Sequence, residues 1–352
     1  MCKKSHSLPV PIVLRAEGTE TITLGLTNSP NRFRSKDDMA DKQLINPDLP
    51  LALGGNTFGW TSSEDDTIAV LDAFIEAGGA HVDTADSYSQ WAPGNSGGES
   101  ETILGNYFAA RGNREQIFLA TKVGGAQDRP GLTPENVTAA VDASLERLQT
   151  DYIDLYYAHY DDETQTVQEL ARTFDALVQD GKIRHIGLSN LSPQRQAAWI
   201  AAAQEEGLTV PAAIQPQYSL AHRSDVEGPA GYGELAEQHD LAVFPYFSLA
   251  AGLLTGKYRS FEDFEGVERE GQLAGYANEE SLNMVESLIE VSEELGHEPA
   301  SVALAWLLAK DVTAPIASAR VPEQLDALIA ASDVRLYPEH VAQLDEASAK
   351  FR

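Results

Sequence analysis

The chain has 352 residues, of which 43% are hydrophobic, so it has enough apolar material for one large domain or two ordinary ones. It carries 54 acidic residues against 25 basic ones, and the resulting formal net charge of −29 would repel the phosphates of a nucleic acid. Its single cysteine excludes an internal disulfide and a cysteine-based zinc site. No apolar run reaches about 18 residues and no signal peptide is recognisable, so we expect an acidic cytoplasmic protein without a membrane or nucleic-acid partner.

The charge is uneven along the chain. Residues 1–38 hold six basic and four acidic residues, which leaves a net charge of −31 on residues 39–352. The first segment also lacks clear periodicity, and Met39 stands at the boundary. We therefore predict that residues 1–38 are a disordered extension or sequence upstream of a misassigned start, and that residues 39–352 form the functional domain.

From about residue 50, short apolar runs alternate with stretches of helical period. The runs that predict strands are Leu51–Leu53, Ala80–Asp83, Ile117–Thr121, Tyr152–Ala158, Ile183–Leu188, Ala212–Pro216, Ala242–Tyr246 and Val312–Ser318. The amphipathic segments between them include Asp65–Ala77, Pro134–Leu148, Thr166–Gln179 and Pro193–Glu205. Most of these strands are continuously apolar, as in sheets that are buried on both faces, so eight such units without a linker predict a single (β/α)8 TIM barrel. The seventh and eighth runs lie about 70 residues apart, which predicts a long insert near residues 256–280.

The predicted helices carry start and stop signals. Thr133 and Ser192 are cap residues that each precede a proline at the first helical position. Gly78–Gly79 and Gly181 stand where the preceding helices should end. These signals agree with the strand–helix alternation.

Polar residues gather where the predicted strands end. In a barrel of this kind the chemistry sits at the carboxyl ends of the strands. Strand-end interiors otherwise favour aliphatic residues, so an acid, a base, an imidazole and a phenol at one face indicate a site. In chain order these residues are Asp83, Tyr88 in the following loop, Lys122, His159, Ser189–Asn190, Gln215 and Tyr246.

These residue types predict carbonyl chemistry. A phenol is a poor acid at neutral pH, with a reference pKa of about 10, and a nearby ammonium lowers that pKa. We expect Lys122 to supply the ammonium and Asp83 to hold it charged. Tyr88 would then donate a proton to a carbonyl oxygen that His159 positions. No side chain provides a hydride, so a nicotinamide cofactor is implied. The residues suited to hold its carboxamide and to stack on its ring are Ser189, Asn190, Gln215 and Tyr246.

The segment His81–Tyr88 reads HVDTADSY, which resembles the Asp-Thr-Ala…Tyr signature of the aldo-keto reductases. Further segments that resemble this family follow in order: Gly98–Gly105, Ala120–Val123, Leu155–His159, Gly181–Asn190, Ile214–Leu220 and Tyr246–Tyr258. Each motif alone is moderately specific, whereas their order over about 300 residues is very specific. The resemblance covers about residues 45–350.

The resemblance implies a catalytic tetrad of Asp83, Tyr88, Lys122 and His159, with Tyr88 as the acid. It also implies NADP(H) bound across the barrel mouth without a Rossmann domain, which agrees with the absence of a GxGxxG segment after a strand. Arg320 can pair with a 2′-phosphate, which favours NADPH over NADH. The cofactor-binding residues implied are Gly55, Asn56, Ser189, Asn190, Gln215, Tyr246, Ser248, Leu249, Gly252, Lys257 at the pyrophosphate, Ser318 where the family often has Gly, Arg320 and Gln324.

The main expectation is therefore an NADPH-dependent reductase of aldehydes or ketones, without a metal, with Trp60 and Trp91 as candidate walls of the substrate pocket. One alternative is a non-enzymatic regulatory subunit that uses the same barrel to sense NADP(H). The other is a metal-dependent hydrolase, because His81 and Asp83 form an HxD pair at a strand end. The chain offers no HxH motif that would favour the latter.

Overall fold

In the computed structural model the described residues are 44–267 and 270–352, and all of them lie in one structural unit of the chain. The predicted extension over residues 1–38 and the predicted start at Met39 fall outside the described residues. The architecture below is therefore that of the domain alone.

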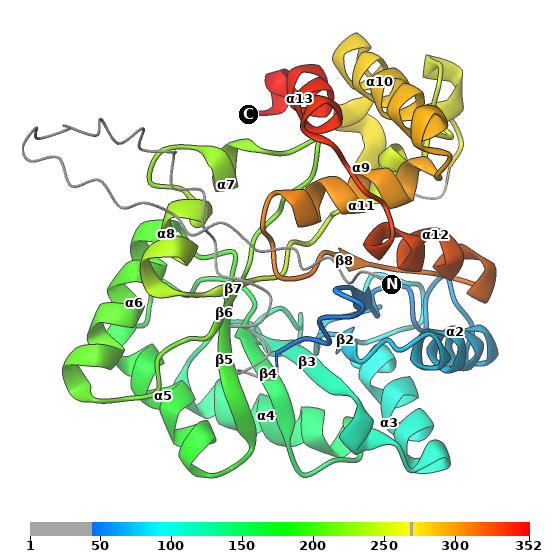
Figure 1. The fold of residues 1–352 in the computed structure, drawn as a ribbon. Coiled ribbons are helices and arrows are strands. Elements are labelled where there is room, and N and C mark those ends of the chain that lie inside the picture. Colours follow the sequence, from blue (N-terminus) through cyan, green and yellow to red (C-terminus); the bar gives the residue numbers. More distant parts are fainter. Residues whose placement is uncertain (1–43, 268–269) are drawn as a thin grey trace, which may run out of the picture. The chain divides into compact units, whose positions relative to one another are not determined.

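Eight parallel strands form one curled sheet of the TIM-barrel type (Figure 1). The strands are β1 Ala52–Gly54, β2 His81–Asp83, β3 Phe118–Val123, β4 Ile153–Ala158, β5 Ile183–Ser189, β6 Ala213–Gln215, β7 Ala242–Val243 and β8 Ile316–Ala317. From β1 to β7 each strand pairs with the next one in the chain, and β8 pairs with β1, so the order is β7-β6-β5-β4-β3-β2-β1-β8. The backbone N–H of Ile316 donates to the Pro245 carbonyl over 2.9 Å and links the segments of β8 and β7. All eight predicted strands are confirmed, but β7 and β8 are short because Pro245 and Pro315 cannot donate ladder hydrogen bonds.

Five helices follow the first five strands and lie around the sheet (Figure 1). The helices are α2 Glu64–Glu76, α3 Glu99–Arg111, α4 Pro134–Leu148, α5 Val167–Gln179 and α6 Pro193–Glu206. The four of them that the sequence analysis predicted, α2, α4, α5 and α6, begin within one residue of the predicted starts. The Thr133 side chain accepts the Asn136 N–H and the Ser192 side chain accepts the Arg195 N–H, which satisfies backbone donors that a helix start leaves open. Gly181 follows the end of one helix with a φ of +73°, a conformation that favours glycine.

The later part of the chain is richer in short helices. Between β7 and β8, the helix α11 (Pro299–Ala309) is apolar on all sides and is buried accordingly from Ala300 to Leu307, where it packs against α10 (Glu279–Leu295) and the elements that follow β8. Near the carboxyl end of the chain, α13 (Pro338–Ala347) lies beside α10 (Figure 1). The other elements are η1 Arg114–Gln116, α7 Ser224–Glu227, α8 Tyr232–His239, η2 Ala250–Thr255, η3 Phe261–Phe264, α9 Glu270–Leu273, η4 Ala274–Tyr276, η5 Pro322–Gln324, α12 Leu325–Ile329, η6 Ala330–Ser332 and η7 Ala349–Phe351.

The interior of the curled sheet is filled by side chains. A Cβ at Gly187 would lie 2.3 Å from Cδ1 of Tyr157, so the absent side chain makes room for that ring. At the amino end of β2, His81 packs between Phe118 and Phe244, and burial lowers the pKa of His81 to about 3. This end of the interior is therefore uncharged. The interior cluster consists of Leu44, Ala52, Ala120, Leu155, Tyr157, Ala213, Ala242, Phe244, Ala314 and Ile316.

None of the helices in the described part of the chain has the length and apolar character that crossing a membrane requires.

Candidate active site

The structure brings Asp83, Tyr88 and Lys122 together at the carboxyl ends of β2 and β3. The Lys122 side chain is fully buried, and its ammonium donates to Asp83 Oδ1 over 2.5 Å, to the Thr84 carbonyl over 2.7 Å and to the Tyr88 hydroxyl over 2.9 Å. An ammonium has three donors, so all of them are used. Burial lowers the pKa of Lys122, while the charge and hydrogen bond of Asp83 oppose that effect.

The expected lowering of the Tyr88 pKa is wrong for this arrangement. Burial raises the pKa of Tyr88 well above its usual value, and the charge of Asp83 adds to the rise. The physical reason is that burial removes the hydration of the phenolate, and the negative charge of Asp83 disfavours a second negative charge beside it. The phenol therefore holds its proton at neutral pH.

His159 follows β4 directly and approaches the same group. Its side chain is nearly buried, stacks on Tyr160 with ring centroids 4.4 Å apart, and meets the Tyr88 ring edge-on at 6.3 Å. Burial, with a smaller contribution from the charge of Lys122, lowers the pKa of His159 well below its usual value. Within the described residues the Nδ1 atom makes no hydrogen bond. This Nδ1 atom is buried beside Gly125, so a small polar ligand would have to be bound through the other nitrogen of the neutral imidazole.

A hydrogen-bond network joins the next strand ends to this group. The Gln215 amide donates to Asp83 Oδ2 over 2.9 Å, and the Ser189 hydroxyl donates to the Gln215 carbonyl over 2.9 Å. The Asn190 amide donates to the His159 carbonyl over 2.9 Å, while its own oxygen accepts from the Tyr246 hydroxyl over 2.9 Å. The ends of five neighbouring strands and the loop after β7 thus carry one connected polar surface.

The residues predicted at the first and last strands also lie near one another. The Ser318 hydroxyl after β8 donates to Asn56 Oδ1 over 2.6 Å. The Gly55 N–H donates to the Asp83 carbonyl over 2.8 Å, which connects this edge to the buried group. Exposed Arg320 lies further along, where its backbone N–H donates to Gln324 Oε1 over 2.8 Å.

The segment after β7 has an unusual backbone. Phe247, Ala250, Ala251 and Gly252 all have positive φ values, between 48° and 99°. The N–H groups of Ala250 and Gly252 donate to the carbonyls of Phe247 and Leu249, so they are used within the turn. Lys257 approaches this turn, with Nζ 3.5 Å from the position that a Cβ on Gly252 would take. The exposed ammonium of Lys257 suits a phosphate.

The structure adds residues that the sequence analysis did not single out. The Thr84 carbonyl accepts from Lys122, but a backbone carbonyl has no sequence signature. Tyr160, which the sequence analysis also missed, stacks on His159 and is 50% exposed. Trp60 and Trp91, the predicted walls of the substrate pocket, form an edge-on pair at 5.6 Å, and Trp91 meets the Tyr88 ring at 6.1 Å. Aromatic side chains therefore flank Tyr88 on two sides.

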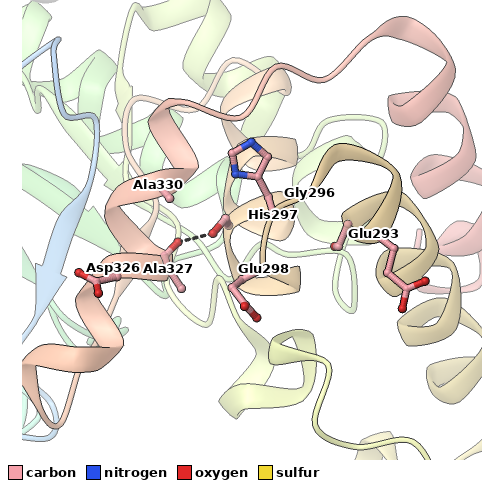
Figure 2. Close-up of a pocket in the computed structure, with 9 residues that line it drawn as sticks. Glu293, Gly296, His297, Glu298, Asp326, Ala327 and Ala330 are labelled. Atoms are coloured by element: carbon pink, nitrogen blue, oxygen red, sulfur yellow. Dashed lines mark hydrogen bonds between the residues drawn. The ribbon is translucent and has the colours of Figure 1, made fainter.

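A separate hollow lies between the end of α10, the start of α11, and α12 (Figure 2). It shares no residue with the predicted site. Its charged side chains include Glu293, Glu298 and Asp326, which would repel the phosphates of a nucleotide. Among the described residues no group of three His, Cys, Asp or Glu side chains could hold a metal ion, and His81 of the HxD pair is enclosed by aromatic rings.

The chain is similar to known reductases and oxidoreductases. Norsolorinic acid reductase stcV of Emericella nidulans is 33% identical over 323 residues, which cover 84% of this chain and 77% of that protein. The uncharacterised oxidoreductase YrpG of Bacillus subtilis is 33% identical over 307 residues, with 84% and 91% covered. L-glyceraldehyde 3-phosphate reductase of Escherichia coli O157:H7 is 30% identical over 314 residues, with 85% and 88% covered. Since the model of the aldo/keto reductase family also matches residues 50–349, the chain belongs to that family of oxidoreductases.

Proposed function

We propose that this protein is an NADPH-dependent reductase that converts aldehydes or ketones to alcohols, with Tyr88 as the proton donor. The observation that carries the proposal is the buried Lys122 ammonium, which donates to both Asp83 and the Tyr88 hydroxyl. A hydroxyl that accepts from an ammonium becomes a better donor, because the charge stabilises the phenolate that the reaction leaves. The raised pKa of Tyr88 keeps its proton in place until negative charge develops on a substrate oxygen.

Each buried residue has a part in this scheme. When bound, the nicotinamide cofactor supplies the hydride that reduces the carbonyl carbon. Tyr88 donates its proton to the carbonyl oxygen, and Lys122 stabilises the phenolate. Asp83, held by Gln215 on its other oxygen, keeps the ammonium charged and oriented. His159 is neutral because its pKa is lowered, so it can hydrogen-bond the carbonyl oxygen without competing as an acid.

The polar surface along the strand ends supports binding of the cofactor. Ser189, Asn190 and Gln215 offer amide and hydroxyl groups for a carboxamide, and the Tyr246 ring beside Asn190 offers a face for stacking. The exposed ammonium of Lys257 beside the left-handed turn supports a pyrophosphate site. The residues that we assign to the cofactor are Gly55, Asn56, Ser189, Asn190, Gln215, Tyr246, Ser248, Leu249, Gly252, Lys257, Ser318, Arg320 and Gln324.

We also propose that the strands form a complete (β/α)8 barrel, with the segment between β7 and β8 as an insert that serves the cofactor. The hydrogen bond between Ile316 and Pro245 supports closure. The left-handed turn at residues 247–252 and the nearby Lys257 lie at the start of that segment, which supports its role.

The substrate side of Tyr88 is aromatic. Trp91 and Tyr160 are 46% and 50% exposed although both are large apolar residues. Trp60 packs edge-on against Trp91, and His159 stacks on Tyr160, so the two exposed rings are held in place. A carbonyl compound with a flat apolar body would cover both exposed rings, and burying their apolar surface would favour its binding.

The first experiment is a fluorescence titration of the purified protein with NADPH and, in parallel, NADH. We expect saturable binding with a preference for NADPH, because the exposed guanidinium of Arg320 can pair with a 2′-phosphate. Arg320→Ala should remove most of that preference and leave NADH binding unchanged. Failure of the wild-type protein to bind either nucleotide would remove the hydride source and refute the proposal.

The second experiment separates a catalyst from a regulatory subunit that only senses the nucleotide. Tyr88→Phe should keep NADPH affinity and lose about 100-fold or more in kcat towards a panel of aldehydes and ketones. Tyr337→Phe, at an exposed tyrosine remote from the strand ends in sequence, is the matched control and should keep wild-type kcat. Equal kcat in both variants would contradict Tyr88 as the proton donor.

A further inference from the structure

A second ionisable group lies close behind the candidate site. Asp86 stands two residues before Tyr88, is only 5% exposed, and its backbone N–H donates to the Lys122 carbonyl over 3.2 Å. Its carboxylate accepts backbone hydrogen bonds from Ser87 and Gly124. The Oδ1 atom has no partner within the described residues. Burying a carboxylate oxygen without a hydrogen-bond partner costs folding free energy, so the burial of Asp86 needs an explanation.

Among the charged side chains, Glu101 has the largest effect on the pKa of Asp86, and it lies fully buried on α3. Glu101 is well compensated, since one oxygen accepts from Thr121 over 2.6 Å and the other from Arg147 over 2.8 Å. Arg147 thus pairs directly with Glu101 and reaches Asp86 only through space. Two acids share one guanidinium, and Asp86 is the one left without an ion pair among the described residues.

Burial raises the pKa of Asp86 to about 7, and the charge of Glu101 adds to this rise. The charge of Arg147 opposes the rise by a smaller amount. The charge of Asp86 in turn raises the pKa of Lys122, in the direction opposite to the effect of burial. Tyr156, from β4, also faces both acids, and burial followed by their charges raises its pKa well above its usual value. Tyr156 therefore stays neutral, and the side-chain charges that shift the pKa of Asp86 are those of Glu101 and Arg147.

We propose that Asp86 is a positioning residue that holds or releases one proton behind the tetrad, and that this proton sets how firmly Lys122 keeps its charge beside Tyr88. The step is a simple ionisation: the carboxyl O–H breaks, the proton passes to solvent, and the carboxylate remains. With Asp86 ionised, Lys122 has two acids near it, Asp83 in contact and Asp86 at longer range. With Asp86 protonated, this longer-range support is lost, while Asp83 remains in contact with the ammonium. The link to carbonyl reduction rests on the proposed function, whereas the effect on Lys122 does not.

The direct test is to titrate Lys122 in the apoprotein. Lysine labelled with carbon-13 at Cε gives one NMR signal per residue, and Lys122→Met identifies the signal of interest. We compare the wild type with Asp86→Asn, which keeps the side-chain shape, and with Asp333→Asn as a matched control at an exposed aspartate. Asp86→Asn should lower the titration midpoint of Lys122 by about one pH unit, and Asp333→Asn should leave it unchanged.

Two further measurements sharpen the test. A raised folded pKa makes Asp86 favour the folded state most at low pH, so wild-type Tm relative to that of Asp86→Asn should fall as pH rises from about 4 to 7. Glu101→Gln removes a charge that raises the pKa of Asp86, so the same fall should move to lower pH. In the enzymatic assay the alkaline limb of the kcat profile should move to lower pH in Asp86→Asn, by the same amount as the Lys122 midpoint.

The outcomes separate this inference from the proposed function. An unchanged Lys122 midpoint in Asp86→Asn, or an equal shift in Asp333→Asn, would overturn the inference whatever the activity. A shifted midpoint with an unmoved kcat profile would overturn the link between Asp86 and the tetrad. A shifted midpoint in a protein that reduces no carbonyl would sustain the control of Lys122 by Asp86 and refute the proposed reaction.

Discussion

Two buried carboxylates, one near each end of the strands, hold cations in different ways. Asp154, the second residue of β4, accepts from Arg114 over 2.8 Å and from Arg184 over 2.7 Å. Asp83, the last residue of β2, accepts from the ammonium of Lys122 over 2.5 Å. Both arginine side chains reach solvent, at 12% and 54% exposure, whereas the lysine side chain is fully buried.

The difference between the two sites follows from the cations. A guanidinium keeps its charge and offers five donors in a rigid plane, so it fixes neighbouring elements without taking part in proton transfer. An ammonium in a dry site responds to each charge around it, because burial and its neighbours shift its pKa in opposite directions. In barrels the amino end of the strands serves stability and the carboxyl end serves chemistry, and under the proposed function the two ion pairs follow that division.

The largest effect is expected when an arginine replaces the lysine at the carboxyl end of the strands. Lys122→Arg should lower kcat by about 100-fold or more, because the fully buried site has no room for a guanidinium that would also contact Tyr88. Steady-state kinetics with NADPH and an aldehyde measures the loss. Arg114→Lys is the reciprocal control and should keep wild-type kcat. A Lys122→Arg enzyme with normal turnover would show that the site accepts a guanidinium and that the type of cation does not matter there.

Asp154→Asn tests the structural end. The carboxylate takes hydrogen bonds from two guanidiniums and from the Leu119 N–H, so its neutralisation should cost about 2–3 kcal/mol of unfolding free energy. Urea denaturation measures that cost. The kcat of the folded fraction should stay at the wild-type value, whereas Asp83→Asn should lose activity. Loss of kcat in Asp154→Asn at unchanged stability would reverse the assignment of the two ends.

The neutral interior at the amino end gives a pH signature. Because the folded pKa of His81 is about 3, below the usual 6.5, its stabilising contribution is present above pH 6.5 and is lost as pH falls towards 3. Between pH 6.5 and 5 this loss amounts to about 2 kcal/mol of unfolding free energy. The variant His81→Gln should show a stability profile that is flatter by that amount. Parallel profiles would mean that His81 accepts a proton in the folded state.

The fold was predictable because burial leaves a pattern in the sequence. Strands that are covered on both faces are continuously apolar, so all eight were found, and cap residues such as Thr133 marked helix starts correctly. The convergence of Asp83, Lys122 and His159 was predictable because parallel strands bring their carboxyl ends to one edge. The lengths of β7 and β8 were overestimated because their prolines interrupt the ladder.

The energetics of the site were less predictable. Whether the pKa of Tyr88 rises or falls depends on the balance between burial and the charges of the neighbouring Lys122–Asp83 pair. No residue spacing in the sequence encodes that balance. The contact between Lys122 and the Thr84 carbonyl involves a backbone atom that every residue possesses. Asp86 and Glu101 become neighbours only through the packing of α3 against the strands. Sequence motifs identify the ionisable groups of the site, whereas their protonation states depend on the burial and the neighbouring charges that the structure gives them.

The smallest expected effect separates the two arginines that share Asp154. Arg184 is 54% exposed and donates to Asp154 over 2.7 Å, so Arg184→Ala should cost at most about 1 kcal/mol of unfolding free energy. Arg114 also donates to the carbonyls of Ile117 and Tyr152, so Arg114→Ala should cost clearly more in the same urea titration. Equal costs would mean that Asp154 responds only to the number of charges beside it. The expected inequality means that the planar guanidinium of Arg114 joins the segment before β3 to the start of β4.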